Sequence, residues 1–138
     1  MSGWLGVVSR SHVELGVGLG IAQVMHGKRA GLARMKPGDW LVYYSPRTAY
    51  PDGEPLKAFT AIGRIADDDI WQADEGDFHP YRRRVDYLAL EREVHLAEVS
   101  AQLELTAVPN WGYQLRRGLI PLAETDLRVI RDAASRPA

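Results

Sequence analysis

The sequence contains no cysteine among its 138 residues. This absence excludes disulfide bonds, thiolate nucleophiles and zinc sites built from cysteine. No apolar stretch approaches the roughly 18 residues that a membrane-spanning helix needs. The apolar start, residues 1–9, is interrupted by Gly3 and Gly6 and has no basic segment before it, so we expect no signal peptide. Together these absences predict a cytoplasmic protein that does not bind membranes.

The sequence also lacks a strong excess of one charge, because its net charge is −1. That balance excludes the strongly basic footprint of tight, sequence-independent nucleic-acid binding. The charges are nevertheless distributed unevenly along the chain. Residues 1–48 carry six Lys or Arg against two acids, whereas residues 67–104 carry eleven acids against four Arg. This asymmetry fits either a local basic face or a solvated surface of mixed charge.

Patterns that indicate catalysis or metal binding are few. No pair of histidines has the H-x-x-x-H spacing of a metal site. Residues 67–69, three aspartates, lack the alternating ligands and the glycine of a calcium loop, so we expect a solvated turn there. The glycine-rich residues 16–20 lack the Gly-Lys-Ser/Thr ending of a phosphate loop, and no serine lies in a G-x-S-x-G motif. We therefore expect no metal, no cofactor and no catalytic residue.

Short β-branched and aromatic runs bounded by turn residues predict five or six strands. They are Trp4–Ser9, Trp40–Tyr44, Phe59–Ile65, Ile70–Ala73, Tyr81–Leu90 and Leu119–Leu122, and residues 21–25 form a further, brief candidate. Small helices between short strands predict an α+β fold with a closed or nearly closed sheet, since closure removes unpaired edges. The length fits one domain over residues 1–138.

The clearest predicted helix is Ala123–Ala134. It has acids in its first turn and arginines later, which suits the helix dipole, and its apolar residues share one face. Shorter helices are predicted at Lys28–Arg34 and Leu96–Leu105. For residues 10–20 we expect only a helical turn near His12–Leu15 followed by a loop, because each interior glycine costs about 1 kcal/mol in a helix.

Two of the predicted strands end in a serine on a face that is otherwise apolar or aromatic. Leu5, Val7 and Ser9 alternate along the first, and Leu41, Tyr43 and Ser45 alternate along the second. If these faces look inward, two hydroxyls line a pocket at the end of a barrel. The alternative is that both serines bond to nearby backbone and simply end their strands.

Two segments combine aromatic rings with polar groups that suit a flat ligand. Residues 110–118 contain Asn110, Trp111, Tyr113 and Arg116, which could supply a stacking platform and directional hydrogen bonds to a base. Residues 79–84 place Tyr81 beside three arginines and favour a phosphate-facing patch. The alternatives are a core tryptophan with solvated arginines in the first segment, and a solvated basic strand edge in the second.

The ordered set of these segments resembles the EVE family. The similar stretches are Trp4–His12, His26–Lys28, Met35–Trp40, Tyr43–Pro46, Phe59–Ile65, Asn110–Gly112 and Gly118–Leu122, followed by a final helix. They span nearly the whole chain in the family's order. Within the family, the chain is most similar to the EVE-like proteins of bacteria and archaea.

The resemblance implies a PUA-like mixed β-barrel of five to six strands flanked by short helices, related to YTH and ASCH domains. It also implies a non-catalytic module that binds nucleic acid, DNA or RNA, and holds a base, often a modified one, in a pocket at one end of the barrel. The family's first-strand serine corresponds to Ser9. Its aromatic and polar pocket positions correspond to Tyr44, Ser45, Tyr81 and Trp111.

Residue patterns and resemblance together give one predicted site. The ligand contacts are Ser9, His26, Lys28, Tyr44, Ser45, Tyr81, Asn110 and Trp111, and the phosphate contacts are Arg82, Arg84 and Arg116. A hydrolase acting on a modified nucleoside, by analogy with ASCH domains, is one alternative. It needs a lysine and an acid that converge, for which His26 and Lys28 are the nearby candidates. A small-molecule sensor is the other alternative.

Overall fold

The computed structural model describes residues 2–137 and contains one mixed, seven-stranded sheet. The hydrogen-bonded order is β2–β5–β4–β3–β1–β7, with β6 paired to β4. The strands are β1 (Gly3–Val7), β2 (Ile21–Ala22), β3 (Trp40–Arg47), β4 (Pro55–Gln72), β5 (Tyr81–Tyr87), β6 (Val94–His95) and β7 (Leu119–Leu122). No helix in this part of the chain is long and apolar enough to cross a membrane.

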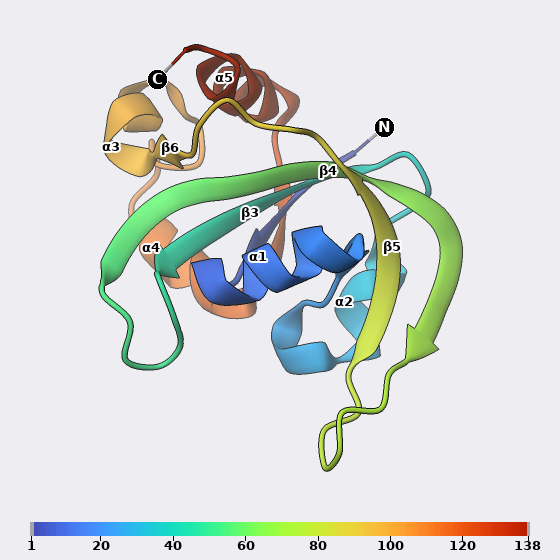
Figure 1. Cartoon of the computed structure of the whole chain (residues 1–138). Helices are drawn as coiled ribbons and strands as arrows, with labels where there is room; N and C mark the ends of the chain where they lie inside the picture. Colours follow the sequence, from blue (N-terminus) through green and yellow to red (C-terminus); the bar gives the residue numbers. More distant parts are fainter. Residues whose placement is uncertain (1, 138) are drawn as a thin grey trace.

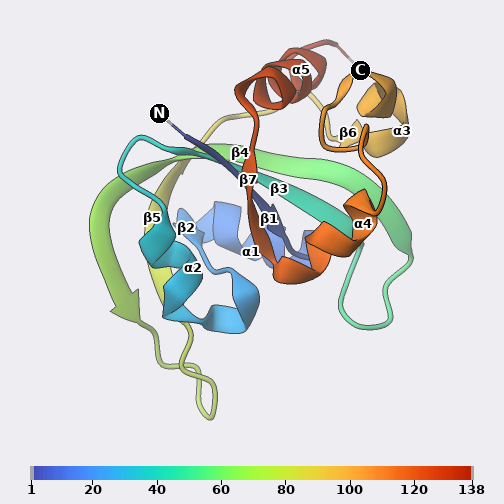
Figure 2. The same cartoon turned by 180° about the vertical axis from the view of Figure 1, so that it is seen from behind.

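Helices cover both faces of the curved sheet (Figure 1). On the inner side lie α1 (Arg10–Leu19), the short turn η1 (Met25–Gly27) and α2 (Arg29–Arg34). On the outer side lie α3 (Leu96–Val99), η2 (Ser100–Gln102), α4 (Trp111–Gln114) and α5 (Glu124–Ala134), with η3 (Leu115–Arg117) leading into β7. The long band of β4 arches over the inner helices, and Figure 2 shows β1 and β7 from behind.

The side chains of β3 alternate between two hydrophobic cores. Leu41 and Tyr43 point to the inner core with Leu32 of α2, whereas Val42 and Tyr44 point to the outer core that α5 covers. A sheet buried on both faces needs apolar residues at successive positions, and Trp40–Tyr44 supplies them. The alternation predicted for this strand is thereby confirmed.

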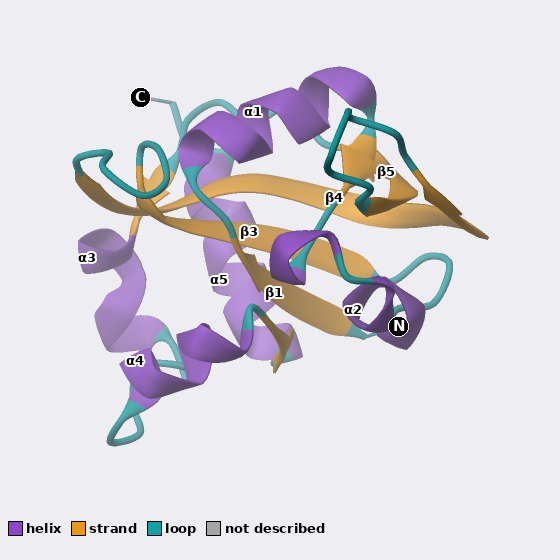
Figure 3. Ribbon diagram, turned by 90° about the horizontal axis from the view of Figure 1, so that it is seen from below, coloured by secondary structure: helices purple, strands orange, loops and turns teal. Residues whose placement is uncertain are grey.

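Strand β1 lies at the centre of the mixed pairing, parallel to β3 and antiparallel to β7. Figure 3 shows β1, β3 and β4 side by side. The predicted α+β fold with a mixed sheet is confirmed. Within residues 2–137 the ladder ends at β2 and β7, so the barrel is curved but is not closed by hydrogen bonds between them. The strand count is seven because two strands of only two residues add to the longer ones.

Two predicted strands and the turn between them are one strand, β4, which corrects the sequence-based boundaries. Its register with β5 shifts between Ile65 and Ile70, so the three aspartates bulge from the ladder instead of ending it. Arg83 of the facing strand explains this continuity. Its Nε donates to the Asp67 carbonyl at 2.9 Å, and its guanidinium also bonds the Leu32 and Met35 carbonyls at the end of α2.

The first helix is longer than predicted, because α1 continues to Leu19 in spite of its glycines. Gly16 is buried, and a Cβ there would lie 2.9 Å from the Ile21 carbonyl oxygen. Tertiary packing therefore requires the glycine and outweighs its low helix propensity. Gly20, at φ 69°, ends the helix in the left-handed conformation that glycine adopts easily.

The remaining predicted helices are present with adjusted ends. Helices α2 and α5 each begin one residue later than predicted and end at the predicted residue. The predicted helix Leu96–Leu105 is shorter, since α3 gives way to η2 at Ser100. The buried Asp126 in the first turn of α5 accepts the backbone N–H groups of Glu104 and Leu105, at 2.7 and 2.9 Å, which fixes the loop that follows η2.

Asp39, just before β3, ties the start of the chain to the sheet. Its carboxylate accepts hydrogen bonds from the Ser2 and Lys36 backbone N–H groups at 3.1 and 2.9 Å and from the Trp4 indole at 3.0 Å. Burial alone would raise the pKa of Asp39, but these hydrogen bonds outweigh it and hold the pKa below its usual 3.8. The ionised form therefore stabilises the fold.

Asp39→Asn should lower the free energy of unfolding by about 1–3 kcal/mol at pH 7, because it replaces a charged acceptor of three bonds. Since the folded pKa is the lower one, this contribution is present above pH 3.8 and is lost as the pH falls through the folded value. Urea unfolding at several pH values should show the deficit shrinking in acid. Asp52→Asn, in an exposed loop, is the control, and an equal deficit there would contradict the assignment.

Candidate functional site

Cationic and aromatic side chains surround a cavity of about 530 Å³ at one end of the barrel. Its walls come from the end of β1, the start of α1, residues 23–28 around η1, the end of β3 with the loop after it, the β4–β5 hairpin and the segment before β7. The lining residues are Val7, Val8, Ser9, His12, Gln23, Met25, His26, Gly27, Lys28, Pro46, Arg47, Ala49, Tyr50, Phe78, Arg116, Arg117 and Gly118.

The cavity is electrostatically one-sided. Lys28, Arg47, Arg116 and Arg117 line it, and no Asp or Glu is present among its described lining residues. A chain with a net charge of −1 thus concentrates positive charge at one concave surface, which attracts anions. Within residues 2–137, no three His, Asp or Glu side chains lie close enough together to hold a metal ion.

One wall of the cavity is a left-handed turn. Met25, His26 and Gly27 have φ values of 52°, 58° and 82°, so three successive residues are left-handed and two of them are not glycine. Such backbone is uncommon outside glycine and persists only where its surroundings hold it. This turn directs His26 and, directly after it, Lys28 towards the cavity.

Close packing on both sides holds the turn in place. Gly31 of α2 and Gly118 before β7 leave room for Met25, because a Cβ would lie 2.7 Å from the Met25 sulfur in the first case and 3.1 Å from its Cγ in the second. A Cβ on Gly27 would lie 2.7 Å from the Cβ of Pro80. The turn therefore connects α2, β7 and the β4–β5 hairpin around the cavity.

Aromatic rings and apolar side chains form the rest of the lining. The His26 ring meets Tyr50 edge-on, with centroids 6.1 Å apart and an angle of 62° between the planes. Phe78 contributes a further ring from the hairpin, and Val7, Val8, Met25 and Pro46 supply apolar surface. The arrangement offers a flat, partly apolar ligand both stacking surfaces and cations.

The structure brings together four of the residues that the sequence predicted for the site. Ser9, His26, Lys28 and Arg116 all line the cavity. Ser9 is buried directly before α1, with its hydroxyl 3.4 Å from that of Ser11. The Arg116 guanidinium lies 5.3 Å from the centre of the Tyr113 ring, which is exposed.

The other predicted contacts lie outside the cavity lining. Ser45 is fully buried, with its hydroxyl 2.7 Å from that of Thr60, because a bulge in β4 brings Thr60 beside it. Tyr44 packs against Phe59 in the outer core, and Trp111 is half-buried against the same core. Asn110 is an exposed residue before α4, and Tyr81 packs against the inner core.

The two strand arginines predicted to contact phosphate make contacts within the protein. Arg84 lies 5.0 Å above the Trp71 ring and pairs with Asp67 and Asp69 at 3.2 and 3.5 Å. Arg82 pairs with Glu75 and bonds to Gln23. The acids of residues 67–75 explain this difference. Asp67 and Asp69 lie where the register of β4 with β5 shifts, and Glu75 follows the end of β4.

Sequence reasoning missed His12, Gln23, Arg47, Tyr50, Phe78 and Arg117 as lining residues. They come from five separate segments that only the tertiary fold brings together. A weak signal was present in Tyr50, an aromatic residue in a loop rich in proline and glycine that the structure leaves 72 % exposed.

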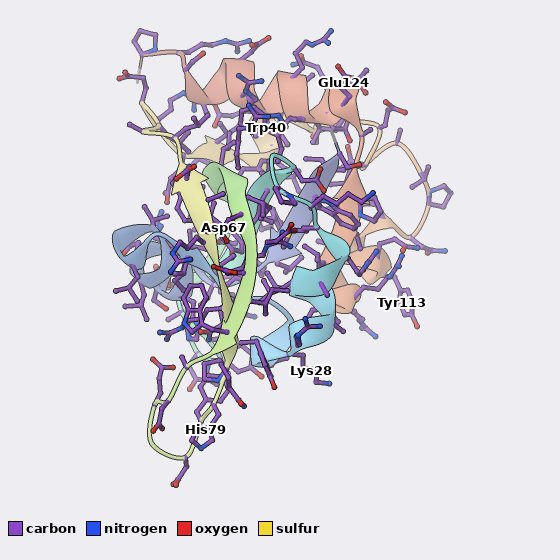
Figure 4. The ribbon with its side chains drawn as sticks, turned by 90° about the vertical axis from the view of Figure 1, so that its right-hand side faces the viewer. Lys28, Trp40, Asp67, His79, Tyr113 and Glu124 are labelled. Atoms are coloured by element: carbon purple, nitrogen blue, oxygen red, sulfur yellow. The ribbon has the colours of Figure 1, made fainter. Side chains whose placement is uncertain are left out.

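A second hollow, about 580 Å³, lies at the opposite end of the molecule beside Trp40 and α5 (Figure 4). Its arginines make contacts within the protein. Arg64 and Arg131 lie 4.8 and 4.3 Å from the Trp40 ring, and Arg128 pairs with Glu124 at 3.3 Å. Its volume is similar, but its lining includes Glu124, whereas no carboxylate is among the described lining residues of the first cavity.

Comparison with known proteins gives the same family over almost the whole length. The model of the EVE domain matches residues 2–133. A UPF0310 protein of Renibacterium salmoninarum is 60% identical over 130 residues, covering 94% of this chain and 93% of that protein. A UPF0310 protein of Bacillus subtilis is 42% identical over 132 residues, covering 94% and 90%.

Solved structures share the fold at low sequence identity. Human THYN1 protein, in complex with 5-methylcytosine containing DNA, superposes with a TM-score of 0.61 at 14% identity and full coverage of both chains. A hypothetical protein from Leishmania major has a TM-score of 0.61 at 12% identity, covering 94% of this chain and 92% of that one. These similarities confirm the PUA-like fold.

The left-handed turn makes a prediction about stability. The free energy of unfolding of His26→Gly should exceed that of His26→Ala by about 1 kcal/mol, because a φ of 58° is unfavourable for alanine and not for glycine. At Glu14, an exposed position inside α1, the alanine variant should instead be the more stable of the two, by about 1 kcal/mol. Chemical unfolding of the four variants measures both differences. Alanine and glycine of equal stability at position 26 would show that the turn is not left-handed in solution.

Proposed function

We propose that this chain, which belongs to the EVE domain family, binds nucleic acid by taking one base, carrying a modification such as a methyl group, into the cavity. The single observation that carries the proposal is the cavity's lining of four Lys or Arg, stacking rings and no described carboxylate. The cations attract the phosphates and the rings stack on the base. The fold shared with THYN1, whose structure contains DNA with 5-methylcytosine, supports the same function.

The proposed base-binding residues are Ser9, His26, Tyr50 and Phe78, and the proposed phosphate-binding residues are Lys28, Arg47, Arg116 and Arg117. Tyr113 could stack a neighbouring base at the edge of the cavity, since Arg116 lies over its ring. We propose binding without chemistry, because Lys28 has no carboxylate among the described lining residues with which to form an acid–base pair.

The apolar part of the lining should favour a methylated base. Burying one methyl group contributes about 0.8 kcal/mol, which corresponds to roughly fourfold in affinity. Single-stranded DNA with one base among abasic positions should therefore bind more tightly with 5-methylcytosine than with cytosine, and with thymine than with uracil. Fluorescence anisotropy measures both pairs. Binding of all four oligonucleotides without a methyl effect would remove the modified base from the proposal, and no binding would reject the proposal itself.

The cationic lining makes a separate prediction about salt. Lys28→Ala and Arg116→Ala should each weaken binding and reduce the slope of log Kd against log salt by about one, because each removes one phosphate contact. Arg128→Ala, which removes the same charge from α5, is the matched control and should leave the slope unchanged. If Arg128→Ala alters the slope and the cavity variants do not, the nucleic acid binds at the opposite end of the barrel.

A further inference from the structure

A chain of three hydrogen-bonded side chains, which we call the relay, ends at one of the residues that line the cavity. Glu75, before the β4–β5 turn, pairs with Arg82 Nη2 at 2.7 Å. Arg82 Nε in turn donates to Gln23 Oε1 at 3.1 Å, and Gln23 lines the cavity. The Arg82 side chain is only 15% exposed and its contact with Gln23 is partly buried, whereas Glu75 is 40% exposed.

The chemistry of this relay fixes which way the Gln23 amide faces. A guanidinium group can only donate hydrogen bonds, and an amide nitrogen cannot accept one. The atom of Gln23 that faces Arg82 must therefore be Oε1. The other polar atom, Nε2, bonds to no acceptor within residues 2–137 and carries two hydrogens. Gln23 can offer the cavity a donor but not its amide oxygen.

The backbone of Gln23 is held as well as its side chain. Its N–H lies against the Tyr43 hydroxyl, and the adjacent Tyr87 hydroxyl donates to the Ile21 carbonyl at 2.8 Å. Burial raises the pKa of Tyr43 to about 12, against the Tyr87 and Gln23 hydrogen bonds that lower it, so Tyr43 is a neutral phenol at physiological pH. The two stacked rings, 6.5 Å apart, form a rigid support under the residue.

We propose that Gln23 selects the bound base by donating from Nε2 to a carbonyl oxygen on its edge, with Arg82 and Glu75 as positioning residues. The inference rests on the proposed function, because it assigns the chemistry of the base that enters the same cavity. It also gives Arg82 a role different from the predicted phosphate contact. A base that presents an amino group to Nε2 meets donor against donor, which leaves both groups unsatisfied.

The test compares two bases at a time, which differ only in having a carbonyl or an amino group at one position. These are uracil against cytosine and hypoxanthine against adenine, each as the one base of an otherwise abasic single-stranded DNA. The native protein should bind the carbonyl member of each pair about tenfold more tightly, the cost of one unmade buried hydrogen bond. The ratio of one variant's affinities for the two bases does not depend on the fraction of protein that is folded. A variant of low stability can therefore still be tested.

Two variants alter the relay in opposite ways. Gln23→Glu keeps the shape but makes the group an acceptor, so the preference should reverse towards the amino member. Arg82→Met releases the amide to rotate, so the ratio should fall towards one, whereas Arg82→Lys keeps a donor for Oε1 and should retain most of the preference. Gln72→Glu and Arg84→Met make the same changes on β4 and β5, outside the cavity lining, and should leave both ratios as in the native protein.

The outcomes separate the two proposals. Oligonucleotides that bind equally in each pair, with ratios that none of the variants moves, would overturn the role of Gln23 and leave the binding function intact. A preference that Arg84→Met changes as much as Arg82→Met would overturn the relay. Absence of binding by all four oligonucleotides would reject the proposed function and, with it, this inference.

Discussion

Three successive residues in the left-handed conformation, Met25 to Gly27, determine the shape of the candidate site. Met25 fits beside glycines of α2 and of the segment before β7, and Gly27 packs against Pro80 beyond the β4–β5 turn. Elements that are distant in sequence therefore meet at one short turn. The residues that follow from this geometry, His26 and Lys28, carry an aromatic ring and a charge to the cavity. The turn lowers the stability of the fold, because packing in the inner core must offset the free-energy cost of its strained backbone.

Charge distribution is the second constraint, and it follows from how the sheet pairs. Most acids of residues 67–104 lie on or near β4, β5 and the outer helices, where arginines of β5 face several of them. The cations around the cavity come from other segments and have no carboxylate among the described lining residues. A nearly neutral chain thus acquires a positive concave surface because the fold separates its cations from its acids, and not because cations are in excess. That is why net charge alone gave no indication of it.

Sequence patterns identified the fold better than the site. Alternation predicted both faces of β3, and dipole-matched charges predicted α5, because these signals are local. The length of α1 could not be predicted, since Gly16 is required by contact with Ile21 and not by helix propensity. The site shows the same division. Ser9, His26 and Lys28 lie near short motifs in sequence, whereas Gln23 and Phe78 reach the cavity only through tertiary packing. Ser45 has the parity of a pocket residue, but the β4 bulge places Thr60 against its hydroxyl.

The central claim is that nucleic acid enters the cavity formed around the left-handed turn. Backbone amide chemical shifts, followed by NMR during titration with single-stranded DNA containing one methylated base, test it most directly. The account predicts that the largest shifts occur at residues 7–9, 23–28, 46–50 and 116–118, with the amides around Trp40 and α5 unchanged. Shifts concentrated around Trp40 and α5, with the turn at Met25–Gly27 unaffected, would contradict it.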